Sequence, residues 1–430
     1  MTLWKGALTQ TLIASILSLD MKVLVVEDSQ MVSRVLQRLF LTSDLPLEVV
    51  FCESLLQAQE KVDLYEDIFA ALVDLNLPDA PNGEIVDFIL AQNIPTIVLT
   101  GSYDDDKRES LLQRGVVDYI IKESRFSYEY AVQLVHRLLK NQAIKVLLVE
   151  DSSSYRLLVR KQLEKHLYQV IEACDGQEGL EKLKQDPEIK LILTDYEMPN
   201  MNGIELVQNI RRDYETSELK IIGLSAADSP ALSAKFIKSG ANDFLTKPFN
   251  YEELHCRVMH NIEQMELVAQ IQDAANRDFL TGLHNRRYLF EQAEKQLGPS
   301  QNKACLAMLD LDFFKRINDD FGHDAGDSVL TQLANLLRNT FNRFLHARIG
   351  GEEFCILLNG LNQEQAELLM QHFCKLVNDT AFTYKDQTLP VTVSIGLVER
   401  ELDNFSQMLN RADEMLYKAK EAGRNNVCSE

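Results

Sequence analysis

The sequence is short of positive charge and lacks the patterns of several common protein classes. Its 430 residues carry 44 Lys and Arg against 65 Asp and Glu, a formal net charge of −21 at pH 7. Because binding to a phosphate backbone depends on Lys and Arg, we expect no nucleic-acid partner. The seven cysteines are scattered without a Cys-x-x-Cys spacing, which argues against a zinc site and fits a reducing, cytoplasmic compartment.

Long hydrophobic runs are also missing. The longest early apolar patch, residues 12–19, contains Ser15 and Ser18 and is too short to cross a bilayer, so we expect no membrane span. Since Met21 directly precedes the first strand-like run, residues 1–20 are expected to be a dispensable extension, with a short membrane-surface helix as the alternative. The Gly-x-x-x-x-Gly-Lys-Ser/Thr loop is absent too, so any nucleotide is held without a P-loop.

A duplication fills the first half of the chain. The segment 22–29, KVLVVEDS, returns at 145–152 as KVLLVEDS, and three further matches follow in the same order. Short apolar strands alternate with amphipathic helical stretches in both copies. This alternation predicts two flavodoxin-like, doubly wound α/β domains, at residues 21–125 and 145–250, joined by a linker helix at 126–144.

Each copy places acidic residues where its strands end, and the carboxyl ends of parallel strands meet at one edge of a sheet. Three carboxylates in one cleft call for a hard cation such as Mg²⁺, beside which the central aspartate can act as a nucleophile towards a phosphoryl group. Polar residues that only cap the sheet are the alternative, which two complete copies disfavour. The two predicted trios are Glu27, Asp28 and Asp74, and Glu150, Asp151 and Asp195.

Both copies resemble the receiver domains of two-component response regulators. The resemblance implies that Asp74 and Asp195 accept a phosphoryl group from a sensor histidine kinase or a phosphotransfer protein, with one Mg²⁺ per receiver. The second copy has the family's Lys247-Pro248 pair where the first has Lys122-Glu123, so the first copy is expected to signal less efficiently. The implied backbone metal ligands are Asn76 and Glu197, and the implied switch residues are Thr100, Tyr119 and Lys122 in the first copy and Ser225, Phe244 and Lys247 in the second.

Residues 251–276 contain no Gly or Pro, and their apolar residues recur at helical spacing. We expect a helical stalk here, either a short coiled coil or a helix packed on its own domain. A different pattern follows at 277–430. Gly350 and Gly351 precede Glu352 and Glu353 between two strand-like runs, which predicts a hairpin with an acidic tip.

An apolar strand before this hairpin ends at Asp310. Carboxylates from two neighbouring strands would fit a two-metal site of the kind that polymerases use for phosphoryl transfer. A calcium-binding EF-hand loop is the rival interpretation, but Phe313, Phe314 and Ile317 stand where such a loop needs oxygen ligands and glycine.

Residues 277–430 resemble the GGDEF family of diguanylate cyclases. The resemblance rests on the opening at 278–287, the block at 310–318, Gly-Gly-Glu-Glu-Phe at 350–354 and the closing stretch at 412–425. It implies an α+β, palm-like domain that joins two GTP molecules into cyclic di-GMP and two pyrophosphates, and a homodimer, because each subunit holds one GTP. Two Mg²⁺ or Mn²⁺ ions per site would be held by Asp310, the Leu311 carbonyl and Glu352, with Glu352 or Glu353 as the base. The implied GTP-binding residues are Asn318 and Asp327 for guanine, together with Phe314, Lys315, Gly350, Gly351, Lys420 and Arg424.

One expected element of the family is missing. Many members carry Arg-x-x-Asp shortly before the Gly-Gly pair, where it binds the product and inhibits the enzyme. At that spacing this chain has Phe341 and Phe344, so no product-inhibition site is expected. Two alternatives to a phosphorylation-controlled cyclase stay open: a silent scaffold that binds GTP or cyclic di-GMP, and a receiver-based adaptor whose third domain only dimerises.

Overall fold

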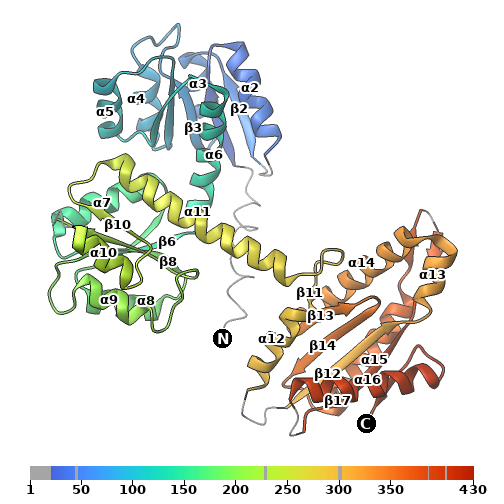
Figure 1. Cartoon of the computed structure of the whole chain (residues 1–430). Coiled ribbons are helices and arrows are strands. Elements are labelled where there is room, and N and C mark those ends of the chain that lie inside the picture. Colours follow the sequence, from blue (N-terminus) through green and yellow to red (C-terminus); the bar gives the residue numbers. More distant parts are fainter. Residues whose placement is uncertain (1–20, 44–46, 227–229, 299–302, 386, 402–403) are drawn as a thin grey trace. The chain divides into compact units, whose positions relative to one another are not determined.

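The computed structural model describes residues 21–43, 47–226, 230–298, 303–385, 387–401 and 404–430. The expected extension at 1–20 lies outside these residues. The chain divides into two compact units, one up to Glu266 and one from Leu267 onwards. The first unit contains both predicted receivers, and the second contains the predicted catalytic domain (Figure 1).

The first receiver is a five-stranded parallel sheet in the order β2-β1-β3-β4-β5 with helices on both faces, as predicted. Strand β1 has every residue buried, which explains its continuous apolar run. The elements are β1 Lys22–Val26, α2 Gln30–Leu41, β2 Glu48–Cys52, α3 Leu55–Leu64, β3 Ile68–Asp74, α4 Glu84–Ala91, β4 Thr96–Thr100, α5 Asp105–Arg114, β5 Asp118–Ile121 and α6 Arg125–Asn141.

The second receiver repeats this topology, with strand order β10-β9-β8-β6-β7. The bond between Lys247 and Pro248 is cis. The elements are β6 Lys145–Val149, α7 Ser153–Lys165, β7 Gln169–Ala173, α8 Gly176–Gln185, β8 Ile189–Asp195, α9 Gly203–Ile210, β9 Lys220–Ser225, α10 Pro230–Lys238, β10 Asp243–Thr246 and α11 Tyr251–Asn276.

Both segments that were predicted as helical connections are helices, and each packs at least in part on a receiver. The predicted linker 126–144 is almost entirely α6, and its Leu134 and Leu138 pack with Val23 of β1 in the core of the first receiver. The helix was predicted correctly but its packing in the receiver core was not, because an amphipathic helix gives no sign of which surface its apolar face covers. Helix α11 was correctly predicted as a helix. Its first turns pack in the core of the second receiver through Leu254, Val258 and Ile262, whereas Leu267 and Ile271 are exposed.

The second unit is an α+β domain around a six-stranded mixed sheet, in the order β11-β13-β14-β12-β17-β18. Strand β12 is completely buried and pairs antiparallel with both β14 and β17. The elements are β11 His284–Asn285, α12 Arg286–Leu297, β12 Ala304–Leu311, α13 Phe314–Phe321, α14 His323–Thr340, β13 Leu345–Gly350, β14 Glu353–Asn359, α15 Gln363–Asp379, β15 Phe382–Tyr384, β16 Gln387–Leu389, β17 Val393–Glu399, α16 Phe405–Glu421 and β18 Val427–Ser429.

Helix α16 lies unusually close to β17. A Cβ at Gly396 would come within 2.1 Å of the Ala412 carbonyl oxygen and 2.2 Å of the Leu416 amide nitrogen. Glycine is required here because backbone atoms, which cannot rotate aside, occupy the space of a side chain. The contact fixes the helix that carries Lys420. Among the described residues, none of the helices is both long and apolar enough to cross a membrane.

Candidate functional site

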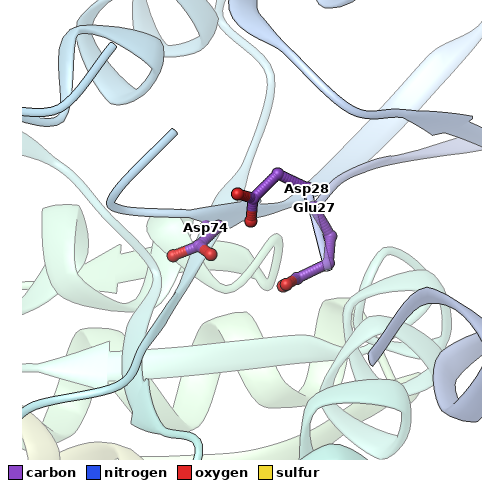
Figure 2. A group of neighbouring side chains, drawn as sticks. All are labelled: Glu27, Asp28 and Asp74. Atoms are coloured by element: carbon purple, nitrogen blue, oxygen red, sulfur yellow. The ribbon is translucent and has the colours of Figure 1, made fainter. Parts of the chain in front are cut away.

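Three carboxylates converge at the strand ends of the first receiver. Glu27 and Asp28 follow β1 and Asp74 ends β3, and one oxygen from each lies within 4.8 Å of the others (Figure 2). The Lys122 Nζ, just beyond β5, donates to Glu27 and to Asp74 at 2.6 Å each. One ammonium against three carboxylates leaves an excess of two negative charges, which suits a divalent cation with oxygen ligands.

Burial and charge act against each other in this pocket. Burial raises the pKa of Glu27, and the ammonium of Lys122 partly opposes that effect. For Lys122 itself, burial acts to lower the pKa, but the hydrogen bonds that it donates to Asp74 and Glu27 outweigh this effect and the pKa is raised. Lys122 therefore stays charged across the physiological pH range and neutralises part of the trio.

The second receiver has the same arrangement. Oxygens of Glu150, Asp151 and Asp195 lie within 4.8 Å of one another. The Lys247 Nζ donates to Glu150 at 2.6 Å and to Asp195 at 2.8 Å. It also lies 4.4 Å from the centre of the Tyr155 ring, an aromatic neighbour contributed by α7. Both trios predicted from the strand ends are thus brought together.

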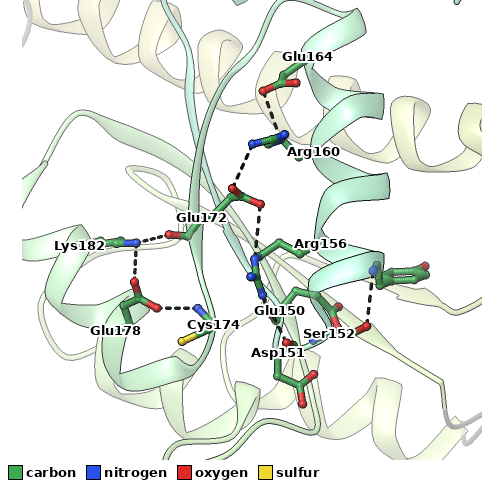
Figure 3. A network of polar contacts seen from close by, with 11 residues as sticks. Glu150, Asp151, Ser152, Arg156, Arg160, Glu164, Glu172, Cys174, Glu178 and Lys182 are labelled. Atoms are coloured by element: carbon green, nitrogen blue, oxygen red, sulfur yellow. Dashed lines mark hydrogen bonds and ion pairs between the residues drawn. The ribbon is translucent and has the colours of Figure 1, made fainter.

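A charged network that sequence reasoning missed extends from Glu150 of the second trio (Figure 3). Arg156 of α7 donates to the Glu150 carbonyl oxygen at 2.6 Å and pairs with Glu172 at 3.5 Å. In the first receiver the corresponding contact comes from the Ser33 hydroxyl, 3.4 Å from the Glu27 carbonyl oxygen. Counting along the repeat would have aligned Arg156 with Ser33. The two acidic loops are therefore held by chemically different anchors.

The other predicted switch residues stand on strands β4 and β5 of the first receiver and β9 and β10 of the second. Thr100 is fully buried, with its hydroxyl 3.3 Å from the Ser102 carbonyl oxygen. The Tyr119 hydroxyl donates to the same carbonyl at 3.0 Å. In the second receiver Ser225 is buried and the Phe244 ring packs 5.5 Å from Phe236. The predicted backbone ligands Asn76 and Glu197 are exposed on the loops after Asp74 and Asp195.

The acidic hairpin of the second unit is present as predicted. Strands β13 and β14 are antiparallel, and Glu353 lies opposite Asp310 of β12 in the sheet register. The Lys420 Nζ of α16 pairs with Asp310 at 2.8 Å. Burial raises the pKa of Asp310, with Lys420 opposing it. Burial and the nearby charge of Asp310 likewise raise the pKa values of Glu352 and Glu353.

A cavity of ≈ 480 Å³ opens beside the glycines of this hairpin. Three of its residues were predicted as GTP contacts, namely Asp327, Gly350 and Gly351. Asp278, Asn285 and Arg348 also line it and were missed as site residues, although Arg348 stands two residues before the glycine pair. The complete lining is Asp278, Phe279, Leu280, Asn285, Arg286, Arg287, Asp327, Arg348, Ile349, Gly350 and Gly351.

Arg348 holds the turn of the hairpin in place. Its Nε and Nη2 donate to the Gly351 carbonyl oxygen at 2.9 and 2.7 Å, and its Nη1 donates to Asp278 at 2.9 Å. A planar guanidinium can make these contacts together because its donors form a rigid fork. Arg348 thereby links the Gly-Gly turn to Asp278, near the beginning of the domain.

The residues that were predicted to bind GTP differ in their exposure to solvent. Asn318 lies against α14, so closely that a Cβ at Gly326 would come within 2.0 Å of its Oδ1. Lys315 and Asp327 are exposed, whereas Phe314 is 7% exposed and packs in the hydrophobic core. The observed role of Phe314 is packing, and its contact with substrate stays a prediction. Phe341, at the missing Arg-x-x-Asp, is fully buried against Phe373.

Comparison with known proteins gives two family matches. The response regulator receiver domain matches residues 23–128 and 146–259, and the domain described as "Diguanylate cyclase, GGDEF domain" matches residues 275–426. The curated relatives include the response regulator PleD of Caulobacter vibrioides, 30% identical over 66% of this chain, and diguanylate cyclase A of Treponema denticola, 29% identical over 52%.

These matches do not extend over the whole of those relatives, since the chain spans 65% of PleD and 64% of diguanylate cyclase A. A solved structure described as a two-component system response regulator/GGDEF domain protein is 46% identical. The match covers 57% of this chain and 99% of that one, with a TM-score of 0.53. The chain therefore belongs to the family of response regulators in which receiver domains precede a GGDEF domain.

Proposed function

We propose that this protein is a phosphorylation-regulated diguanylate cyclase. The observation that carries the proposal is the arrangement at one end of β12, where Asp310 and its partner Lys420 lie beside Glu352 and Glu353 of the acidic hairpin. The cavity along Gly350 and Gly351, the two residues that precede Glu352 in the hairpin, has room for a nucleotide. Similarity to PleD and to diguanylate cyclase A supports the assignment.

In the proposed reaction the 3′-hydroxyl of one GTP attacks the α-phosphate of another. A new phosphoester bond forms, the bond to pyrophosphate breaks, and the hydroxyl proton passes to Glu352 or Glu353. The pKa values of these two carboxyls are raised, which brings the values closer to the pKa of a general base that works near neutral pH. Repeating the step with the roles exchanged closes the ring and releases the second pyrophosphate.

The carboxylates of Asp310 and Glu352, with the Leu311 carbonyl, form a hard oxygen donor set that fits Mg²⁺ or Mn²⁺. Two such ions, when bound, would neutralise developing charge on the phosphates and lower the pKa of the attacking hydroxyl. Lys420 and Arg424 would bind phosphate oxygens. The Asn318 amide would donate and accept hydrogen bonds at the guanine edge and the Asp327 carboxylate would accept them, and the glycines would let ribose and triphosphate lie against the hairpin.

The reaction needs two GTP molecules facing each other, so it requires a homodimer in which each subunit presents one cavity. Phosphorylation of Asp74 and Asp195 by a histidine kinase or a phosphotransfer protein would bias that dimer. Each receiver trio, with two negative charges in excess of its lysine, suits one Mg²⁺. We further propose that the apolar Phe341 and Phe344 leave the enzyme without product inhibition at that surface.

A turnover assay on the full chain tests this function. Purified protein with GTP and Mg²⁺ should form cyclic di-GMP, detected by chromatography, and beryllofluoride as a phosphoryl mimic should raise the rate. Asp74→Asn and Asp195→Asn, separately and together, assign the effect to a receiver. Absence of product even with beryllofluoride would favour a scaffold or an adaptor, and equal activation of the double variant would exclude control by the receivers.

Glu352→Gln provides the matched active-site variant, because it keeps the size of the side chain and removes its charge. It should abolish turnover while the fold, followed by circular dichroism, is retained. A variant with near-normal rate would contradict the role of Glu352. For the missing inhibitory site, tight binding of cyclic di-GMP to a Glu352→Gln dimer would contradict the proposal.

A further inference from the structure

A buried carboxylate two residues after Asp310 has a set of hydrogen-bond donors of its own. Asp312 follows β12 and is 4% exposed. Its Oδ1 accepts from the Ser394 hydroxyl at 2.7 Å, and its Oδ2 accepts from the Thr392 hydroxyl at 2.8 Å and from the Asn425 backbone N–H at 3.0 Å. These donors satisfy a charge that would otherwise be costly to bury. The second aspartate of the Asp-Leu-Asp run therefore anchors backbone.

The backbone that Asp312 holds has an unfavourable conformation. Gly423, Arg424 and Asn425 have φ values of 111°, 63° and 49° in succession, all in the left-handed region. Residues with a Cβ adopt this region only when their surroundings impose it. The hydrogen bond from the Asn425 N–H to Asp312 is such a constraint, since it fixes the turn directly after α16. Arg424 thus leaves the helix in a direction set from inside the domain.

The side chain of Arg424 has a second support. Its guanidinium carbon lies 4.7 Å from the centre of the Phe313 ring, in the range of a cation–π contact. Phe313 is 63% exposed, which is unusual for so large an apolar ring at the edge of a polar site. It also has a φ of 56° as the N-cap of α13, so the ring is displayed from a constrained position.

We propose that Asp312 and Phe313 are positioning residues for Arg424, and that through Arg424 they set the affinity of the site for the triphosphate of GTP. Asp312 fixes the backbone from which Arg424 projects, and Phe313 holds its guanidinium. A cation held in place before binding loses less conformational freedom when the phosphate arrives. The inference rests on the proposed function, because it takes the triphosphate of GTP as the group that Arg424 binds.

The test measures binding of a non-reactive GTP analogue to the full-length chain by calorimetry, alongside KM and kcat. Phe313→Leu keeps an apolar side chain but removes the ring, and should weaken binding about 2- to 5-fold, the value of an exposed cation–π contact. Phe313→Tyr keeps a ring and should bind normally. Asp312→Ala should weaken binding about tenfold, whereas Asp312→Asn, which can still accept from the Asn425 N–H, should come within about threefold of the wild type.

The decisive comparison repeats Phe313→Leu in an Arg424→Ala background. If Phe313 acts through Arg424, its substitution should change the affinity there by less than about twofold. Equal weakening in both backgrounds, or no weakening in either, would overturn the inference, and so would Asp312→Asn as harmful as Asp312→Ala. Because Phe313 is exposed, its variants should fold even if Asp312→Ala does not.

The same measurements separate this inference from the proposed function. Wild-type protein that binds the analogue but forms no cyclic di-GMP would contradict the cyclase reaction, while the double-variant comparison would still decide the role of Phe313. Wild-type protein that turns over GTP without coupling between Phe313 and Arg424 would overturn this inference alone. Failure of the wild type to bind the analogue would overturn both.

Discussion

Gly326→Ala should impair recognition of guanine without unfolding the domain. The added Cβ would lie 2.0 Å from the Asn318 Oδ1 and 3.0 Å from the Phe314 Cζ. The amide of Asn318 must therefore move by about 1 Å or more to restore an ordinary contact distance. Since this amide ends a flexible side chain, moving it costs little stability. Alanine in place of glycine within α14 recovers about 0.5–1 kcal/mol of helix propensity.

The cost of displacing the Asn318 amide and the gain in helix propensity should nearly cancel in the stability of the domain. The loss of GTP binding has no such compensation. An amide turned away from the purine edge leaves hydrogen bonds unmade, at about 1–3 kcal/mol, or roughly 5- to 150-fold in KM for GTP. Because this interaction is made equally in the ground and transition states, kcat should change little. As the KM for GTP rises, the ratio of kcat/KM for GTP to kcat/KM for ATP should fall.

Steady-state kinetics with GTP and ATP, together with thermal melting of the full chain, would measure both effects. Asn318→Ala is the matched control because it removes the group that the new methyl displaces. In that background Gly326→Ala should cause no further rise in KM. A normal KM for Gly326→Ala alone, or an undiminished effect in the Asn318→Ala background, would refute the reasoning.

Three further perturbations address other parts of the molecule. Arg348→Lys, which cannot reproduce the two-pronged contact with Gly351, should lower kcat/KM for GTP about tenfold or more while the melting temperature changes little; an unchanged kcat/KM would contradict the role of the fork. Burial raises the pKa of Asp118 to about 6, so the stability that its protonation contributes is lost as the pH rises through that value. Asp118→Asn should therefore stabilise the first unit against urea by about 2–3 kcal/mol at pH 8 and by clearly less at pH 5. A stabilisation that does not depend on pH would refute this prediction. Gly396→Ala should destabilise the second unit by about 1–3 kcal/mol or more and lower turnover, because the new methyl would push α16 and Lys420 away from the sheet; a normal melting temperature would contradict the close packing.

The elements that the sequence predicted well share one physical property. Asp74 and Asp195 stand at the ends of short apolar strands, so their place follows from the alternation of strand and helix and from the common edge of a parallel sheet. Asp310 likewise stands near the end of an apolar strand. The hairpin at Gly350 and Gly351 followed in the same way from turn chemistry between two strand-like runs. Local patterns sufficed because the site is built where local elements end.

What the sequence did not predict depends on contacts between distant segments. The apolar face of α6 is visible in the sequence, but nothing local shows that it packs on β1 rather than forming a linker. Arg156 and Asp312 look like surface charges until the Glu150 carbonyl oxygen and the Asn425 N–H are placed beside them. Such roles follow from chain segments brought together by folding, up to 113 residues apart for Asp312 and Asn425.

The contact between Arg348 and Asp278 has a mechanical consequence. Asp278 stands two residues beyond the end of α11, and Arg348 joins it to the Gly351 carbonyl oxygen. A displacement at the beginning of the domain therefore reaches the glycine turn through one rigid, planar group, without first deforming the central sheet. The guanidinium is a rigid bridge between Asp278 and Gly351, and its dimensions are fixed by covalent geometry rather than by packing.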